Sequence, residues 1–173
     1  MGEVGAREGI YLPLHNSNQR GTMTEDERGR SIEILLVEDS PDDARLVEIG
    51  LKTAKVLNNL HKARDGIEAM AFLRREGDFV HAPRPDLILL DLNLPRMDGR
   101  EVLAEIKKDE SLRVIPVVVL TVSRNEGDIL KTYNLHANAY IIKPFDQNQF
   151  LAVIKTIEDF WLSVVRLPPQ QGD

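Results

Sequence analysis

Five side chains that could handle a phosphoryl group stand directly after apolar runs of the chain. In chain order they are Glu38 and Asp39 after residues 32–37, Asp91 after residues 87–90, Thr121 after residues 115–120 and Lys143 after residues 139–142. Three carboxylates brought together repel one another, which raises the pKa of one of them or requires a cation. Mg²⁺ suits such a site because it takes oxygen ligands, keeps several waters and often bridges to phosphate.

Asp91 is the residue of this set that could react. A carboxylate can attack phosphorus as a nucleophile and form a covalent intermediate. The ammonium group of Lys143, together with a metal ion, would balance the charge on the transferred group. The hydroxyl group of Thr121 could donate a hydrogen bond to a phosphoryl oxygen. The set therefore predicts an aspartate that accepts a phosphoryl group in a Mg²⁺-dependent reaction.

Each of these residues also has an ordinary structural interpretation. An aspartate after a strand, such as Asp91, is more often a turn former or a helix cap. Thr121 could be a β-branched strand residue, and Lys143 a solvated surface lysine. Glu38 and Asp39 could be a polar strand end that helps to cap a helix. Their joint occurrence at strand ends is what favours a site.

The elements that would position these residues alternate along the chain. Strands are expected at residues 32–37, 59–63, 87–90, 115–120 and 139–142, and helices at residues 40–54, 66–73, 101–108, 128–135 and 146–164. Apolar strands that alternate with helices indicate a parallel sheet covered on both faces. The fold class is therefore α/β, with a doubly wound five-stranded parallel sheet that would bind ligands beyond the carboxyl ends of its strands.

Composition excludes several other classes of function. The chain has 173 residues, no cysteine and a formal net charge of −6. The lack of cysteine excludes disulfides, thiolate zinc sites and cysteine nucleophiles, and it fits a reducing cytoplasm. The negative charge argues against general nucleic-acid binding, and the apolar runs are too short to span a membrane. We therefore expect a cytoplasmic protein with no DNA or membrane partner.

The pattern divides the chain into three segments. Residues 1–30 show no apolar period apart from a short island at residues 10–14, so we expect a flexible N-terminal extension. Met23 is a plausible alternative start, in which case this extension would be an artefact. Residues 31–165 are expected to form the folded domain, and residues 166–173 a C-terminal tail.

Four short motifs carry a resemblance to a known family. They are Leu36-Val37-Glu38-Asp39-Ser40, Leu90-Asp91-Leu92-Asn93-Leu94-Pro95-Arg96-Met97-Asp98-Gly99, Val119-Leu120-Thr121 and Lys143-Pro144-Phe145. Over residues 31–155 the chain resembles the receiver domains of two-component response regulators. The resemblance implies a flavodoxin-like sheet with strand order 2-1-3-4-5 and a phosphoryl group taken from a histidine kinase. It also implies a protein that catalyses only its own phosphorylation and dephosphorylation.

The resemblance assigns metal ligands as well. Asp39, Asp91 and the backbone carbonyl of Asn93 would hold Mg²⁺, and Glu38 would act through water. Glu38 stands where many members of the family have a second aspartate, which an outer-shell role should tolerate.

The resemblance further implies a switch. Thr121 and Tyr140 would form the switch pair, in which the aromatic ring follows the hydroxyl group when the domain is phosphorylated. The peptide bond between Lys143 and Pro144 is expected to be cis, which a proline makes tolerable. Val122 replaces the small residue of many members, and we expect its bulk to restrict access to the phosphoryl group.

Two segments resemble a narrower group, the single-domain regulators paired with bacterial phytochromes. They are Leu103-Ala104-Glu105-Ile106-Lys107 and Phe160-Trp161-Leu162. A phytochrome kinase is therefore the expected donor.

The output is expected to be a contact of the domain itself, because the residues after Asp146 are too few for an effector domain. Tyr140 and residues 128–135 would form the face that changes. The last helix is apolar on more than one face, through Ile157, Phe160, Trp161, Val164 and Val165. This favours a homodimer through the C-terminal helix region, although the protein's own core could cover the helix instead.

Two other functions stay open. A phosphatase with an aspartyl-phosphate intermediate would need a second acid two residues after Asp91, where Asn93 stands, and a cap insertion for which no segment is long enough. A receiver-like module that binds partners without phosphorylation would not need Asp39, Thr121 and Lys143 beside Asp91.

Overall fold

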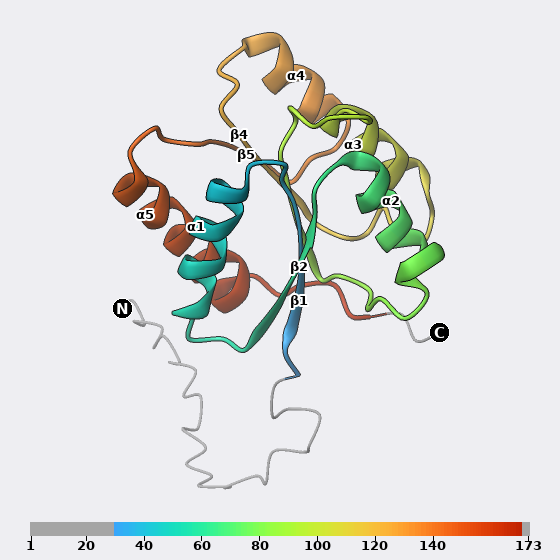
Figure 1. Cartoon of the computed structure of the whole chain (residues 1–173), viewed down its shortest axis with the longest axis horizontal. Coiled ribbons are helices and arrows are strands. Elements are labelled where there is room, and N and C mark those ends of the chain that lie inside the picture. The colour runs from blue at the N-terminus through green and yellow to red at the C-terminus, as the bar shows by residue number, and fades with distance from the viewer. Residues whose placement is uncertain (1–29, 171–173) are drawn as a thin grey trace, which may run out of the picture.

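Five parallel strands form one sheet in the order β2-β1-β3-β4-β5 (Figure 1). The computed structural model describes residues 30–170. The strands are β1 Ile32–Val37, β2 Asn58–Ala63, β3 Leu87–Leu90, β4 Val117–Thr121 and β5 Ala139–Ile142. The predicted α/β class, parallel arrangement and strand order are confirmed.

The burial of each strand follows its place in the sheet. β3 and β4 are buried at every position, and so are the last four residues of β1. The edge strands β2 and β5 are for the most part only half-buried. Strands that are covered on both faces have continuous apolar sequences, and for this reason the three central strands are the clearest in the sequence.

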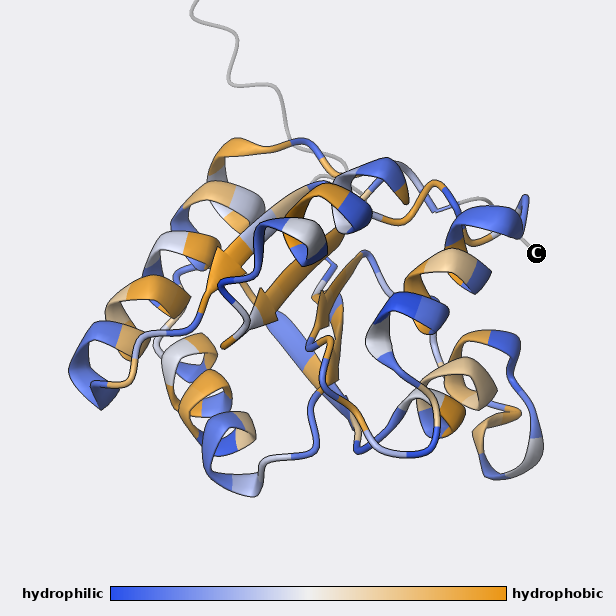
Figure 2. Ribbon diagram, turned by 90° about the horizontal axis from the view of Figure 1, so that it is seen from above, coloured by the Kyte–Doolittle hydropathy of each residue, from blue (hydrophilic) through white to orange (hydrophobic). Residues whose placement is uncertain are grey.

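Helices cover both faces of the sheet. They are α1 Pro41–Lys52, α2 Gly66–Arg74, α3 Gly99–Lys108, α4 Glu126–Asn134 and α5 Gln147–Ile157. α1 and α5 pack on one face, where Val47 and Ile154 are fully buried. α2 and α3 pack on the other face, where Ile106 is fully buried. Figure 2 shows hydrophobic residues gathered in the strands, with hydrophilic residues on the outer turns of the helices.

Two short elements depart from the expected pattern. A 3₁₀ turn, η2 Gly77–Phe79, follows α2, and a π-helical turn, η3 Glu158–Val164, continues α5. The helix expected over residues 146–164 therefore consists of two segments, the α-helix α5 and the π-helical turn η3. α1 begins where the helix expected over residues 40–54 places it: Ser40 is its N-cap and accepts a hydrogen bond from the Asp43 backbone nitrogen at 3.3 Å.

The two ends of the described chain meet at Asp86, just before β3. The Gln170 side chain donates to the Arg84 carbonyl oxygen at 2.8 Å and to Asp86 Oδ1 at 3.1 Å, and Arg30 donates to the same carboxylate. The expected N-terminal extension, with residues 10–14 and the alternative start at Met23, lies outside the described residues. No helix within residues 30–170 is long and apolar enough to cross a membrane.

Candidate functional site

Three carboxylates lie together at the carboxyl ends of β1 and β3. One oxygen from each of Glu38, Asp39 and Asp91 lies within 4.8 Å of the others. Glu38 and Asp91 are buried, whereas Asp39 is exposed. The Asp91 backbone nitrogen donates to the Val37 carbonyl oxygen at 3.0 Å, which ties the two acidic strand ends together. Oxygen ligands at this spacing fit a divalent cation.

Lys143 supplies the positive charge of this cluster. It follows β5, and its side chain is only 3% exposed. Its Nζ donates to Asp91 Oδ2 at 3.0 Å and to Asp43 Oδ2 at 2.9 Å, and it also donates to Glu38. The sequence predicts Lys143 at the site but misses Asp43, which lies within the helix expected over residues 40–54.

Burial and the opposite charge of the partner act against each other on Glu38 and Lys143. Burial raises the pKa of Glu38 to about 7, and Lys143 opposes this rise. Burial disfavours the ammonium form of Lys143, but Glu38 and Asp91 outweigh it and raise the pKa of Lys143 above its usual value. The raised pKa of Glu38 thus comes first from burial rather than from the carboxylate repulsion expected from the sequence. Lys143 stays charged at neutral pH, as a group that balances phosphoryl oxygens must.

Thr121 and Tyr140 are joined through Ser123. Thr121 is fully buried and is the last residue of β4, not the residue after it. The Ser123 backbone nitrogen donates to Thr121 Oγ1 at 3.4 Å, and the Tyr140 hydroxyl donates to the Ser123 carbonyl oxygen at 3.0 Å. The Ser123 hydroxyl also donates to Asp128 of α4 at 2.7 Å. The expected switch pair therefore shares a loop that contacts α4, and the only sequence signal for Ser123 is its place two residues after Thr121.

Asn93 stands on the exposed loop that follows Asp91. Its backbone nitrogen donates to Asp91 Oδ1 at 3.2 Å, while Asp91 Oδ2 accepts from Lys143. Asp91 thus does form a local turn, but from within a buried, charged cluster. The role of the Asn93 carbonyl as a metal ligand stays a prediction. Val122 is 47% exposed, and its effect on access stays a prediction too.

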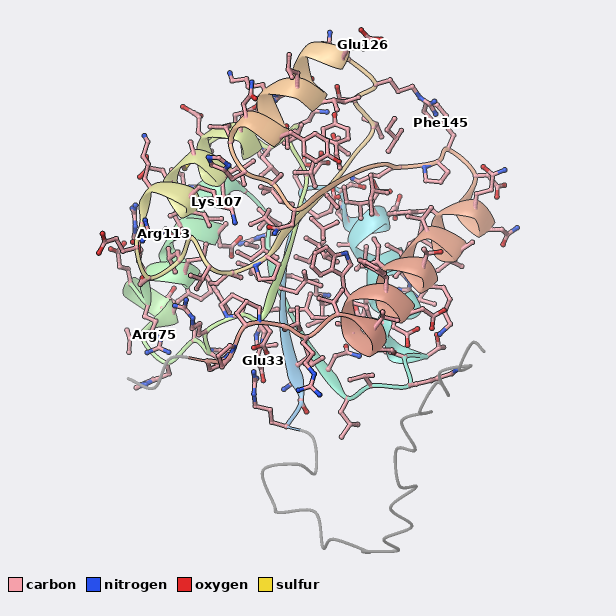
Figure 3. All side chains as sticks on the ribbon, turned by 180° about the vertical axis from the view of Figure 1, so that it is seen from behind. Glu33, Arg75, Lys107, Arg113, Glu126 and Phe145 are labelled. Atoms are coloured by element: carbon pink, nitrogen blue, oxygen red, sulfur yellow. The ribbon has the colours of Figure 1, made fainter. Side chains whose placement is uncertain are left out.

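The peptide bond between Lys143 and Pro144 is trans, so the expected cis bond is wrong. Every peptide bond within residues 30–170 is trans. A proline lowers the cost of a cis bond but still favours trans by about 0.5–1 kcal/mol. Phe145, which follows, is 87% exposed and lies at the end of the sheet opposite to Glu33 (Figure 3).

Gly99 lets α3 begin against the strand end that carries Asp91. A Cβ atom at Gly99 would lie 2.1 Å from the Asp91 carbonyl oxygen and 2.6 Å from Leu92 Cα. We expect Gly99→Ala to lower the thermal unfolding midpoint, measured by circular dichroism, and to weaken divalent-metal binding, because forcing a methyl group into packed backbone costs about 1–3 kcal/mol or more. Gly127→Ala is the control, since its Cβ would meet a side-chain oxygen, that of Asn125 at 2.9 Å, rather than packed backbone. Equal losses in the two variants would contradict this account.

A sequence model of the response regulator receiver domain matches residues 34–155. The chain belongs to this family. The matched range contains the acidic cluster, Thr121, Tyr140 and Lys143, and it confirms the resemblance stated for residues 31–155.

Several phytochrome response regulators are similar to this receiver domain. The response regulator Rcp1 of Synechocystis sp. is 53% identical over 135 residues, which cover 78% of this chain and 92% of Rcp1. The Mn²⁺-bound crystal structure of Rcp1 superimposes with a TM-score of 0.78 at 52% identity, over 80% of this chain and 99% of that one. The structure of the phosphorylated cyanobacterial phytochrome response regulator RcpA superimposes with a TM-score of 0.79 at 53% identity, over 81% of this chain and 100% of RcpA. The structure of the bacteriophytochrome response regulator AtBRR has a TM-score of 0.62 at 42% identity, over 76% of this chain and 96% of AtBRR.

The chain is therefore a receiver-domain response regulator related to the phytochrome response regulators. Its cluster of Glu38, Asp39 and Asp91 fits the divalent metal that receiver domains bind. The identity of the metal and the role of each residue remain predictions.

Proposed function

We propose that this domain accepts a phosphoryl group on Asp91 from a histidine kinase, with a phytochrome kinase as the donor and Mg²⁺ as the metal. The observation that carries the proposal is the Asp91 carboxylate itself, which is buried among two further acids and held 3.0 Å from the Lys143 ammonium group. A buried carboxylate in a charged cluster at a sheet edge is a candidate for chemistry rather than for a surface turn. The similarity to RcpA and AtBRR supports the choice of donor.

The residues around Asp91 divide the work of the transfer. A carboxylate oxygen of Asp91 forms the new bond to phosphorus as the bond from phosphorus to the kinase histidine breaks. Lys143 balances the negative charge of the transferred group, and the Thr121 hydroxyl donates to one of its oxygens. These roles suit phosphoryl transfer, which depends mainly on positioning and on electrostatic stabilisation.

Mg²⁺ would be held by Asp39, Asp91 and the Asn93 carbonyl, with Glu38 acting through water. The exposure of Asp39 and the burial of Glu38 support this division, because the exposed acid can accept a partly hydrated ion. Bound Mg²⁺ would neutralise charge on the phosphoryl oxygens.

Phosphotransfer from purified kinases tests the proposal. We expect a phosphorylated phytochrome kinase to lose its label to this chain within seconds to minutes when Mg²⁺ is present, and unrelated histidine kinases to transfer far more slowly, since partner choice rests on surface complementarity. Equal transfer from all kinases would remove the phytochrome assignment. No transfer from any kinase or small phosphodonor would instead favour the phosphorylation-independent binding module.

We also propose that the output is a contact of the domain itself, with a homodimer through the C-terminal helix region. The apolar residues of that region have divided roles: Ile157 and Leu162 are buried in the core, while Phe160 and Val164 are 51% and 71% exposed. The buried residues of this helix are thus explained by packing on the protein's own core, and the exposed ones are available for an interface.

The exposed part borders a groove of about 340 Å³ between β5 and the end of α5. Its walls are Ala139, Ile141, Val153, Thr156, Ile157, Phe160 and Trp161. β5 is the edge strand beside this groove. A second copy related by a two-fold axis would bring the same edge and the same groove to the contact, as an interface between two identical subunits requires. We name this set of residues the β5–α5 groove.

A further inference from the structure

Glu158 is a fully buried acid far along the chain from the phosphorylation site. It stands where α5 passes into the π-helical turn η3, and it is 0% exposed. Glu158 Oε1 accepts a hydrogen bond from the Lys55 backbone nitrogen at 3.0 Å, and Oε2 accepts one from Lys155 Nζ. A buried carboxylate is costly unless it is paired in this way, so its presence calls for an explanation.

Its two partners tie separate parts of the fold together. Lys55 belongs to the connection between α1 and β2, whereas Lys155 lies one turn before Glu158 on α5. The hydrogen bond to Lys55 spans 103 positions of sequence. Glu158 therefore fixes the first residue of η3 to a part of the chain outside its own helix.

The winding of η3 decides which side chains it presents. A π turn is wider than an α turn, so the side chains after it point in other directions than a continued α-helix would give. Here Leu162 faces the core, Val164 faces outward, and Phe160 and Trp161 stand at the β5–α5 groove with ring centroids 5.6 Å apart and an interplanar angle of 89°.

We infer that Glu158 is a positioning residue: by anchoring η3 to the α1–β2 connection, it sets the apolar side chains that the β5–α5 groove presents to a second copy of this chain. This inference rests on the proposed homodimer. It assigns Glu158 a part in recognition, although its carboxylate is buried away from the contact.

The anchor depends on an acceptor oxygen at position 158 more than on negative charge. Glutamine would keep an oxygen for the Lys55 backbone nitrogen, and an amide is less costly to bury than a carboxylate. In Glu158→Gln, Lys155 would still have an acidic partner in Asp159, whose carboxylate lies 3.3 Å from Lys155 Nζ. Leucine would leave the Lys55 nitrogen without its acceptor, so Glu158→Leu should release the turn and Glu158→Gln should retain it.

The experiment measures self-association of the full chain by sedimentation over a range of concentrations. We expect Glu158→Leu to weaken dimer formation about tenfold or more, an amount equal to about 1.4 kcal/mol. We expect Glu158→Gln to stay close to the wild type. Trp161 is the single tryptophan of the chain, and its emission should shift to longer wavelength only in Glu158→Leu. Phosphorylation by a small phosphodonor should not change in any variant.

Two further variants act as control and substitute. Asp159→Asn removes the neighbouring exposed partner of Lys155 and should leave association unchanged. Lys55→Pro removes the donor of the same hydrogen bond, because proline has no backbone N–H, and it replaces Glu158→Leu if that variant does not fold. If the variants that break the anchor show unaltered association and unaltered Trp161 emission, the inference about Glu158 is overturned, while the proposed homodimer is not affected. A wild type that is monomeric at every concentration would overturn the homodimer and the inference with it, while leaving the phosphorylation proposal intact.

Discussion

Asp91→Asn is expected to reduce phosphorylation by a small phosphodonor and Mg²⁺ to background. The substitution keeps the shape of the side chain and the acceptor for the Asn93 backbone nitrogen, but it removes the nucleophilic oxygen. The wild type should form an adduct that survives acid and is lost in base, as an acyl phosphate is. Intact-protein mass spectrometry after acid quenching measures it directly.

The same substitution decides between the two interpretations of Asp91. Asp109 is a matched control, because it is a turn aspartate whose Oδ1 accepts from the Ser111 and Leu112 backbone nitrogens at 2.8 and 3.2 Å. We expect Asp109→Asn to be phosphorylated like the wild type. An adduct that persists in Asp91→Asn would show that another residue is the acceptor, and Asp91 would then be a turn former only.

The sheet could be predicted because its central strands are buried on both faces. The runs Leu87–Leu90 and Ile34–Val37 have no polar residue, and burial on both sides is the reason. The site follows from the same fact, since in a parallel sheet all strands end at one edge. Once the strands are placed, Glu38, Asp91 and Lys143 lie along the same edge, and the strand order implied by the family resemblance brings them near one another.

What the sequence does not show are polar contacts between distant segments. Asp43 lies 100 positions from Lys143, and Glu158 lies 103 positions from Lys55, so neither pair leaves a local pattern. The π turn is hidden for a related reason: apolar residues at helical spacing predict a helix but do not distinguish an α from a π winding. The trans bond before Pro144 was missed because the expectation came from the family rather than from a contact in this chain.

Lys143→Met is expected to be the most destabilising substitution at the site when a chelator keeps the protein free of metal. Lys143 contacts the carboxylates of Asp91, Asp43 and Glu38, and its side chain is 3% exposed. Removing one partner of a buried ion pair costs about 3–5 kcal/mol, because an uncompensated charge stays behind. Denaturant unfolding measures the loss. Phosphorylation of the variant should also slow by about a hundredfold.

An exposed pair of the same length gives the matched control. Lys62 Nζ lies 3.0 Å from Glu48 Oε2, as Lys143 Nζ lies 3.0 Å from Asp91 Oδ2, but the Lys62 side chain is 47% exposed. Surface pairs contribute about 0–1 kcal/mol, so Lys62→Met should change stability little. Similar losses in both variants would show that the Lys143 cluster is no more than an ordinary ion pair.

The loss in Lys143→Met should depend on pH with a definite sign. Burial already raises the pKa of Glu38 to about 7, and without Lys143 the folded-state pKa rises further above that of the unfolded chain. The folded variant then binds more protons than the unfolded one, so its stability falls as pH rises through this range. We expect a larger deficit at about pH 8 than at about pH 6, and partial recovery when Mg²⁺ replaces the chelator, since an ion that binds only the folded state stabilises it. A deficit that does not change with pH or Mg²⁺ would mean that Lys143 acts through packing, and the charge balance proposed for Asp91 would lose its main support.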